Sequence, residues 1–190
     1  MGGARAAQPH FVAPDPRYRA SWLEALREAH AEGRHRQLDR AQLEVPAEFA
    51  RFVVALRADV SRPGAVARYL AVLSGMPVEK WPDGHVPQTW LWWVAGDEFL
   101  GRLSIRHRLT PHLLVEGGNI GYEVRPSARG HVHASAMLAA ALPLAAALGV
   151  ELAHLDCDDD NPASRQVIEK NGGRLERREP GVLYYVVPTR

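Results

Sequence analysis

The chain has 190 residues, of which 46% are hydrophobic and 24% charged, and this length predicts a single domain with a sizeable core. With 23 Lys and Arg against 22 Asp and Glu, the net charge of +1 provides no excess of cations for binding nucleic acid or an anionic membrane. The only cysteine, Cys157, excludes an internal disulfide and a cysteine-built zinc site. No apolar run is long enough for a signal peptide or a membrane span, so we expect a cytoplasmic protein.

The first third of the chain has the periodicity of helices. Apolar side chains recur at spacings of three and four from Ser21 to Ala31, and Pro46 opens a second helix with an apolar stripe. A third apolar segment runs from Val66 to Leu73. The polar stretch 32–42 and the Pro-rich stretch 76–87 are predicted to be loops.

Strands dominate from residue 88 onward. Thr89 to Val94 and Phe99 to Arg106 flank a Gly-Asp turn and are predicted to form a hairpin, and a short strand follows from Asn119 to Arg125. The remaining pattern indicates a helix over about 130–148, a strand over 151–156, a helix over 162–171, and two strands near 174–178 and 182–187. A strand, a long helix and a strand in succession indicate a parallel crossover, so we expect an α/β fold (α+β, one mixed sheet) with helices on both faces.

The most informative block runs from Gly121 to Ala134. Its strand ends near Arg125, Pro126 stops it, and Arg129 and Gly130 open the following helix. Glycine at that junction lets a ligand approach the backbone, and the first turn of a helix presents N–H groups with a positive dipole end. The pattern suits a pyrophosphate, although a purely structural turn has the same appearance.

A second block, from Asp156 to Gly173, places Asn161 as the cap of a short helix, Pro162 at its first position and Gly172 after its end. The two blocks and the segment 101–107 resemble the GNAT superfamily of N-acetyltransferases, most closely the bacterial branch whose helix ends in Glu-Lys-Asn-Gly-Gly. The resemblance covers about residues 90–187. It implies a GNAT-like acyl-CoA N-acyltransferase fold with a splayed central strand pair, in which about 88–188 form an acetyl-CoA-binding core and about 10–75 a helical acceptor-side part.

The resemblance also implies roles for individual residues. Main-chain groups around Val124 and Arg125 would bind the pantetheine arm, and the Val124 amide would polarise the thioester carbonyl. Asn161 and Ser164 would lie beside the same arm. A primary amine of a small molecule, peptide or protein would then attack the acetyl carbon of acetyl-CoA directly. The pyrophosphate would be held by main-chain N–H groups of the segment Arg129, Gly130, His131, Val132, His133 and Ala134.

Two positions depart from the family pattern. Val132 stands where the motif usually has a second glycine, although valine can adopt the helical dihedral angles expected there. Ile168 replaces a tyrosine that protonates the leaving thiolate in many members of the family. These departures leave a second reading open, in which the domain binds acyl-CoA as a sensor or a structural partner without efficient catalysis.

Proton transfer has three candidate side chains. Glu123 lies on the strand that would meet the acetyl group, His107 ends the second strand of the hairpin, and Tyr122 carries a hydroxyl. Each has a structural reading as well, because alternation puts Glu123 on the face opposite Tyr122 and aromatic residues in strands usually pack. No metal is expected, because helical residues two apart, such as His131 and His133, do not face each other. The acceptor and the oligomeric state stay open, a homodimer included.

Overall fold

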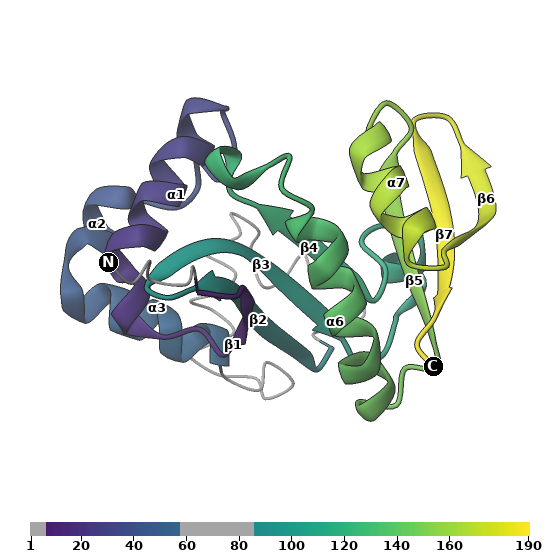
Figure 1. The fold of residues 1–190 in the computed structure, drawn as a ribbon, viewed down its shortest axis with the longest axis horizontal. Helices are drawn as coiled ribbons and strands as arrows, with labels where there is room; N and C mark the ends of the chain where they lie inside the picture. Colours follow the sequence, from purple (N-terminus) through teal and green to yellow (C-terminus); the bar gives the residue numbers. More distant parts are fainter. Residues whose placement is uncertain (1–6, 58–85) are drawn as a thin grey trace, which may run out of the picture.

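The computed structural model describes residues 7–57 and 86–190 and has an α/β architecture (Figure 1). Four strands form one antiparallel sheet in the order β1-β2-β3-β4, and three form a second antiparallel sheet in the order β5-β7-β6. The first sheet consists of β1 (His10–Val12), β2 (Gln88–Ala95), β3 (Glu98–Arg106) and β4 (Ile120–Val124), and the second of β5 (Leu152–Asp158), β6 (Arg174–Glu179) and β7 (Val182–Pro188).

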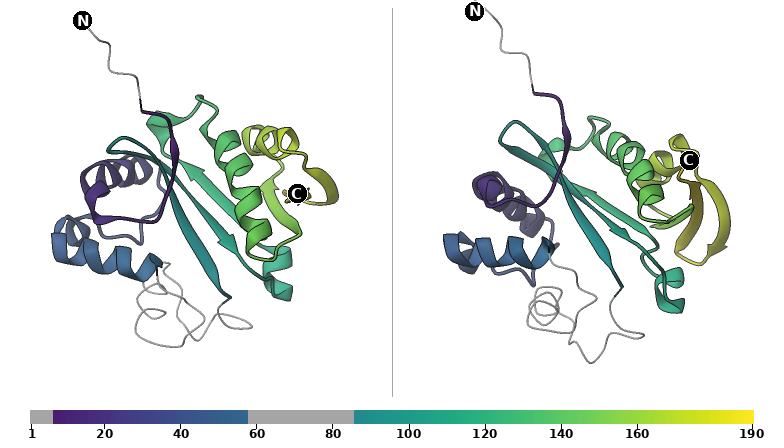
Figure 2. Two further views of the ribbon diagram at one scale, coloured as in Figure 1. Left: turned by 60° about the horizontal axis from the view of Figure 1, so that its bottom comes forward. Right: turned by 90° about the horizontal axis from the view of Figure 1, so that it is seen from below.

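Helices cover both faces of the larger sheet, as predicted. Figure 2 shows the purple and blue helices of the N-terminal part on one face and the green α6 on the other. Within the two described ranges, no helix is both long and apolar enough to span a bilayer. The helices are α1 (Arg19–Ala31), α2 (Arg40–Glu44), α3 (Pro46–Arg57), α5 (Pro111–Val115), α6 (His133–Ala147) and α7 (Pro162–Lys170), with the 3-10 turns η1 (Pro16–Tyr18) and η3 (Pro126–Ala128).

The alternation of side chains along β2 divides the core into two layers. Trp92 is 1% exposed and packs among Trp22 of α1 and Phe49 of α3, whereas Trp93 faces the layer that contains α6 and the second sheet. Burying a side chain of this size contributes roughly 1.5–3 kcal/mol, so both faces of the sheet are stabilised by helices. The N-terminal helices are therefore held rigidly against β2 and β3.

Three local elements differ from the predicted pattern. β1 is too short to show alternation, and it forms because His10 to Val12 pair with β2. α2 begins inside the predicted loop 32–42, where the Asp39 carboxylate caps it, and α5, which Thr110 caps, lies between the predicted strands 99–106 and 119–125. The predicted segment 66–73 and most of the loop 76–87 lie outside the described residues.

The expected mixed sheet is divided in two at the junction of β4 and β5. The Asn119 N–H donates to the His154 carbonyl (2.7 Å), but the His154 N–H donates to the side-chain Oδ1 of Asn119 (2.9 Å) rather than to the backbone. Gly118 has a φ of +53°, and a Cβ there would lie 2.2 Å from the His154 carbonyl oxygen. The side chain of Asn119 thus ends the pairing of the two strands, and β4 and β5 form the splayed pair that the family resemblance implies.

Candidate active site

The backbone of β4 turns the N–H and C=O groups of alternate residues, Val124 among them, toward the splayed edge. The Arg125 N–H donates to the Leu100 carbonyl of β3 (2.9 Å), and Val124 pairs with Gly101 in the register. In an antiparallel ladder, hydrogen-bonded pairs alternate with pairs whose N–H and C=O groups point away from the partner strand. Val124 belongs to the second kind, so its N–H and C=O face the side of β5.

Side chains of β4 alternate between the two faces, as predicted. The Tyr122 hydroxyl lies 2.8 Å from Ser164 Oγ on α7, whereas the Glu123 carboxylate lies on the face covered by α1. Glu123 is therefore separated from Tyr122 by the thickness of the sheet, but it follows that residue directly in the chain and precedes Val124. β4 therefore places the Glu123 carboxylate on the face covered by α1 and the neighbouring Val124 N–H on the splayed edge.

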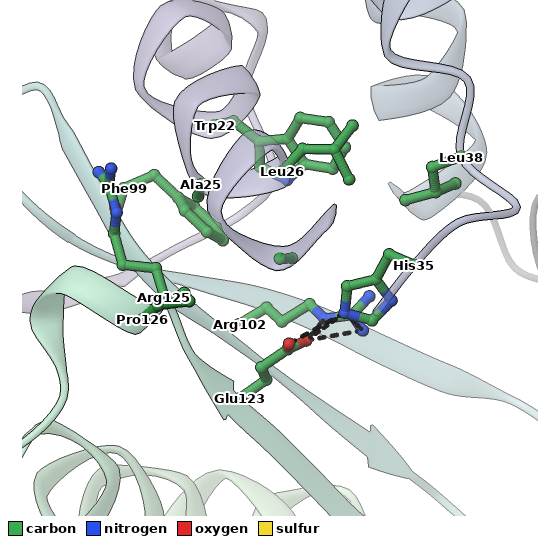
Figure 3. Close-up of a pocket in the computed structure, with 11 residues that line it drawn as sticks. Trp22, Ala25, Leu26, His35, Leu38, Phe99, Arg102, Glu123, Arg125 and Pro126 are labelled. Atoms are coloured by element: carbon green, nitrogen blue, oxygen red, sulfur yellow. Dashed lines mark hydrogen bonds and ion pairs between the residues drawn. The ribbon is translucent and has the colours of Figure 1, made fainter. Parts of the chain in front are cut away.

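The Glu123 carboxylate is the centre of a charged cluster (Figure 3). It accepts hydrogen bonds from Arg102 Nε (2.9 Å) on β3, from His35 Nε2 (2.8 Å) in the loop after α1, and from the Arg34 guanidinium. Arg34 also contacts Glu32 through Nε and Nη2 (2.9 and 2.6 Å). The Glu123 carboxylate is therefore paired with two guanidinium groups and one imidazole.

A pocket lies between α1 and the β3–β4 face, next to this cluster (Figure 3). Most of its wall is apolar, and Glu123, Arg102, Arg125 and His35 provide the polar part. Such a combination is typical of a ligand site, in which apolar walls exclude water and a few polar groups orient the ligand. The apolar lining comes from Trp22, Ala25, Leu26, Ala29, Leu38, Phe99 and Pro126.

His35, Arg34 and Arg102 are residues of the candidate site that the sequence analysis missed. His35 and Glu123 are 88 positions apart, and no motif or periodicity connects them. His35 lies in the polar stretch that reads only as a loop, and Arg102 lies in a hairpin strand without a distinctive pattern. Only the docking of α1 on the sheet brings them together.

The predicted pyrophosphate segment forms an exposed loop before α6, and the helix begins at His133 rather than at Gly130. Gly130 has a φ of +80°, and a Cβ there would meet nothing within 4 Å. Val132 is also left-handed, with φ +56° and ψ +10°, and is 75% exposed. The expectation of helical dihedral angles at Val132 is therefore wrong, because this residue ends the loop instead of continuing the helix.

The first turn of α6 leaves backbone donors facing this loop. The first helical hydrogen bond runs from the Ala136 N–H to the Val132 carbonyl (3.1 Å), and no side chain caps the helix. The N–H groups of residues 133–135, those of His133 and Ala134 among them, therefore come before the first helical hydrogen bond. The predicted His131 side chain turns back to the Arg129 carbonyl, 2.9 Å from Nδ1, so only the backbone of this segment is available for an anion.

The two predicted arginines direct their side chains to α1. Arg125 is buried and its guanidinium binds the Glu28 carboxylate, while Arg129 donates to both oxygens of Glu32 (2.9 and 2.8 Å). Glu28 also accepts from the N–H and the hydroxyl of Ser127 (3.0 and 2.9 Å). Neither arginine presents a free cation to the loop, and their ion pairs fasten α1 to the junction between β4 and α6.

Tyr122, Ser164 and Asn161 meet at the start of α7. Asn161 Oδ1 accepts from the Ser164 N–H (3.0 Å), which is the capping role that the sequence predicts, and Ser164 Oγ contacts the Tyr122 hydroxyl. Burial raises the pKa of Tyr122 to about 12, against a smaller opposite effect of the Ser164 hydrogen bond. Ile168 is fully buried one turn further along α7. The only hydroxyl from β4 at this place, that of Tyr122, therefore stays protonated at neutral pH.

His107 is not brought into this arrangement. Its Nε2 lies 2.8 Å from Thr89 Oγ1, and its N–H donates to the Pro87 carbonyl (2.9 Å) at the far end of the hairpin. His107 lies five positions after Arg102 in the chain, which corresponds to about 17 Å along a strand. Within the part of the chain that the structure describes, no group of three or more His, Cys, Asp or Glu side chains is placed to hold a metal ion.

Comparison with known proteins assigns the chain to a family. The sequence profile of the acetyltransferase (GNAT) domain matches residues 21–174. The chain belongs to this family. It is an acetyltransferase, and its match begins in α1, so the family domain includes the N-terminal helices that line the pocket. A search of curated protein sequences finds no match.

Solved structures share the fold over nearly the whole acetyltransferase chain. RimJ from Mycobacterium smegmatis, in complex with CoA-disulfide, has 16% identity and a TM-score of 0.63, covering 97% of this chain and 84% of that one. The acetyltransferase yncA from Salmonella typhimurium, with its cofactor acetyl-CoA, has 14% identity and a TM-score of 0.56, covering 96% and 94%. RimL, an α-N-protein acetyltransferase of ribosomal L7/L12, in complex with coenzyme A, has 18% identity and a TM-score of 0.58, covering 97% and 98%.

Proposed function

We propose that this acetyltransferase moves the acetyl group of acetyl-CoA to a primary amine of a small molecule, peptide or protein by direct attack. The observation that carries the proposal is the pair of neighbouring groups on β4: the Glu123 carboxylate beside the pocket and the Val124 amide on the splayed edge. RimL and yncA, which share the fold, hold coenzyme A and acetyl-CoA in their structures, and this supports acetyl-CoA as the donor.

The chain offers a backbone site that fits the pyrophosphate of such a donor. The first-turn N–H groups of α6 are uncapped, the loop before them is exposed, and Gly130 has open space where a side chain would stand. Acetyl-CoA supplies an activated thioester when bound. The pantetheine arm would then run along the edge of β4, where the N–H of Val124 faces the side of β5 and is free of the β3 ladder.

The residues of this chain have defined roles in the proposed reaction. Glu123 takes a proton from the ammonium group of the acceptor, and the nitrogen lone pair forms the bond to the acetyl carbon. The Val124 N–H stabilises the negative charge that develops on the carbonyl oxygen. The carbon–sulfur bond breaks, the thiolate takes the proton of the Tyr122 hydroxyl, and the second proton that leaves the nitrogen returns through water to the Tyr122 oxygen. Tyr122 thereby takes the place of the family tyrosine that Ile168 replaces.

Binding and turnover test the proposal in sequence. At 100 times its Kd, acetyl-CoA is expected to raise the free energy of unfolding by about 2.7 kcal/mol, measured as an increase in melting temperature. Release of free thiol is then followed with a panel of amines and N-terminal peptides, with and without an apolar group beside the nitrogen. No thermal shift at millimolar acetyl-CoA would contradict the proposal. Binding without thiol release for any amine would favour the sensor reading.

Replacing Val132 by glycine is expected to tighten acetyl-CoA binding about fivefold. A β-branched residue in the left-handed region costs about 1–2 kcal/mol, part of which the greater flexibility of glycine in the unfolded chain offsets. Relief of this strain stabilises the free and the bound protein alike. Removal of the Cβ and its methyl groups from the loop that would meet the pyrophosphate is expected to add about 1 kcal/mol to the binding free energy. Calorimetric titration measures this Kd. Val132→Ala, which keeps the Cβ and the strain, is the control, and unchanged or weaker binding by Val132→Gly would refute the prediction.

A further inference from the structure

His35 has a backbone conformation that the sequence does not require of a histidine. Its φ is +54°, in the left-handed region that costs a residue with a side chain about 1–2 kcal/mol, and it follows Gly33 at φ +76°. The turn is held by the Leu38 N–H, which donates to the His35 carbonyl (2.9 Å), and by His30 Nε2, which lies 3.0 Å from the same oxygen. Strained residues that the surrounding structure enforces are concentrated at functional sites.

The turn aims the imidazole at Glu123. His35 Nε2 lies 2.9 and 2.8 Å from the two carboxylate oxygens, and both side chains are about four-fifths buried. Figure 3 shows the imidazole and the Arg102 side chain meeting at this carboxylate beside the pocket. The strained turn therefore brings the loop after α1 into contact with Glu123, the proposed proton acceptor.

The imidazole is neutral at physiological pH. Burial, together with the positive charges of Arg102 and Arg34 and a smaller effect of His30, lowers the pKa of His35 to about 4. A neutral imidazole has one N–H and a carboxylate accepts hydrogen bonds. Arg102 Nη2, a donor, lies 3.3 Å from His35 Nε2, but both Glu123 oxygens are closer, at 2.9 and 2.8 Å, which assigns the proton to Nε2. His35 thus donates to Glu123 without adding a charge to a cluster that already contains two guanidinium groups.

Arg34 is the partner of Glu123 that an acceptor amine can replace. Its guanidinium is about one-third exposed and already has a second carboxylate partner, Glu32, at 2.6 Å. Arg102 and His35 both contact Glu123 Oε2, at 2.9 and 2.8 Å, and His35 also contacts Oε1, at 2.9 Å. With Arg34 held by Glu32, these two donors would keep the carboxylate in place while the acceptor takes the position of the Arg34 guanidinium beside Oε1.

We propose that His35 is the positioning residue of this enzyme, a neutral donor that holds the Glu123 carboxylate in the orientation needed to take the proton of the acceptor amine. The proposal rests on the proposed function, in which Glu123 accepts that proton. It predicts that loss of the imidazole lowers kcat and leaves the affinity for acetyl-CoA unchanged, because His35 is not part of the loop before α6.

Four variants test this role by steady-state kinetics. His35→Gly removes the ring while fitting the left-handed backbone, and we expect kcat to fall about 10- to 100-fold, as for a misplaced catalytic group. His35→Gln places an amide N–H near the position of Nε2 and should recover part of the rate. In the Glu123→Gln background, His35→Gly should cause little further loss, because both changes remove the same function. His112→Ala, at an exposed histidine on α5, is the control.

The outcomes separate this role from the proposed function. If Glu123→Gln abolishes turnover while His35→Gly keeps the wild-type kcat, the positioning role is refuted and the proposed function stands. Losses that multiply in the double variant would also refute it, since independent effects multiply. If neither variant loses activity, Glu123 is not the proton acceptor, so its role and the positioning role of His35 are refuted while acetyl transfer to the amine stands. Melting temperature and acetyl-CoA affinity, measured for each variant, show whether a loss of kcat reflects unfolding.

Discussion

Replacing Glu123 by glutamine is expected to lower kcat for amine acetylation by about 100-fold or more, with the affinity for acetyl-CoA unchanged. General base catalysis contributes roughly 10²- to 10⁴-fold, and an amide cannot take the proton of an ammonium group. Gln keeps the size of the side chain, so the pocket lining is preserved, and its carbonyl oxygen can still accept from Arg102 or His35. Initial rates of thiol release at saturating acceptor measure this loss.

The control for this substitution is Glu24→Gln. Glu24 is also a glutamate that pairs with an arginine, Arg27 at 2.6 Å, but it is exposed on α1 and away from the pocket. It should retain the wild-type kcat. A Glu123→Gln enzyme with wild-type kcat would show that the proton leaves the amine by another route, for example directly to water. A large fall in melting temperature would instead indicate that the Arg34 and Arg102 charges need the carboxylate for stability.

Loss of the Glu28 carboxylate is expected to destabilise the protein by about 3 kcal/mol at pH 7. Its side chain is 13% exposed and accepts from the buried Arg125 guanidinium and from the N–H and hydroxyl of Ser127. Glu28→Ala leaves the buried Arg125 guanidinium with the exposed Glu98 carboxylate at 3.5 Å, and breaking a buried pair typically costs about 3–5 kcal/mol. Urea unfolding measures the effect. Glu24→Ala, one turn earlier on α1, should change stability by less than about 1 kcal/mol.

The Glu28 contribution should depend on pH with a defined sign. The hydrogen bond from Arg125 is the largest cause that lowers the pKa of Glu28 from 4.5 to about 2, with Ser127 adding to it and burial opposing it. Because the folded-state pKa is lower than the unfolded one, the stabilisation is complete above about pH 4.5 and is lost as the pH falls toward 2. The stability difference between wild type and Glu28→Ala should therefore shrink between pH 6 and pH 3. A difference that is constant or grows would contradict the assigned ion pair.

The position of Glu28 also connects stability to function. Its carboxylate joins α1 to the backbone of Ser127 in η3, the turn that lies between β4 and the loop before α6. The loop that presents His35 follows the C-terminal end of the same helix. A loosened α1 would thus disturb both the acceptor pocket and the junction that leads to the pyrophosphate loop, and Glu28→Ala should weaken both functions together.

Features that depend on neighbouring residues could be predicted from the sequence. Asn161 and Pro162 start α7, and the strand that carries Glu123 and Val124 ends where Pro126 predicts. Caps, prolines and alternation act over a few residues, so their signals are complete in the local sequence. The conformation of Val132 was mispredicted because its dihedral angles are set by the loop that joins η3 to α6, and a valine carries no signal for a left-handed turn.

The sequence by itself determined the family, the order of the strands and helices from residue 88 onward, and the two segments on which cofactor binding is proposed. Only the tertiary structure decided the surroundings of Glu123, because Arg34 and His35 reach it across 89 and 88 positions of chain. The same holds for Arg125 and Arg129, whose charges read as cofactor contacts but are used by Glu28 and Glu32 of the N-terminal segment. These pairings fit the near-neutral composition. Arg125 and Arg129 are matched by carboxylates, so the proposed pyrophosphate site uses backbone N–H groups instead of cations.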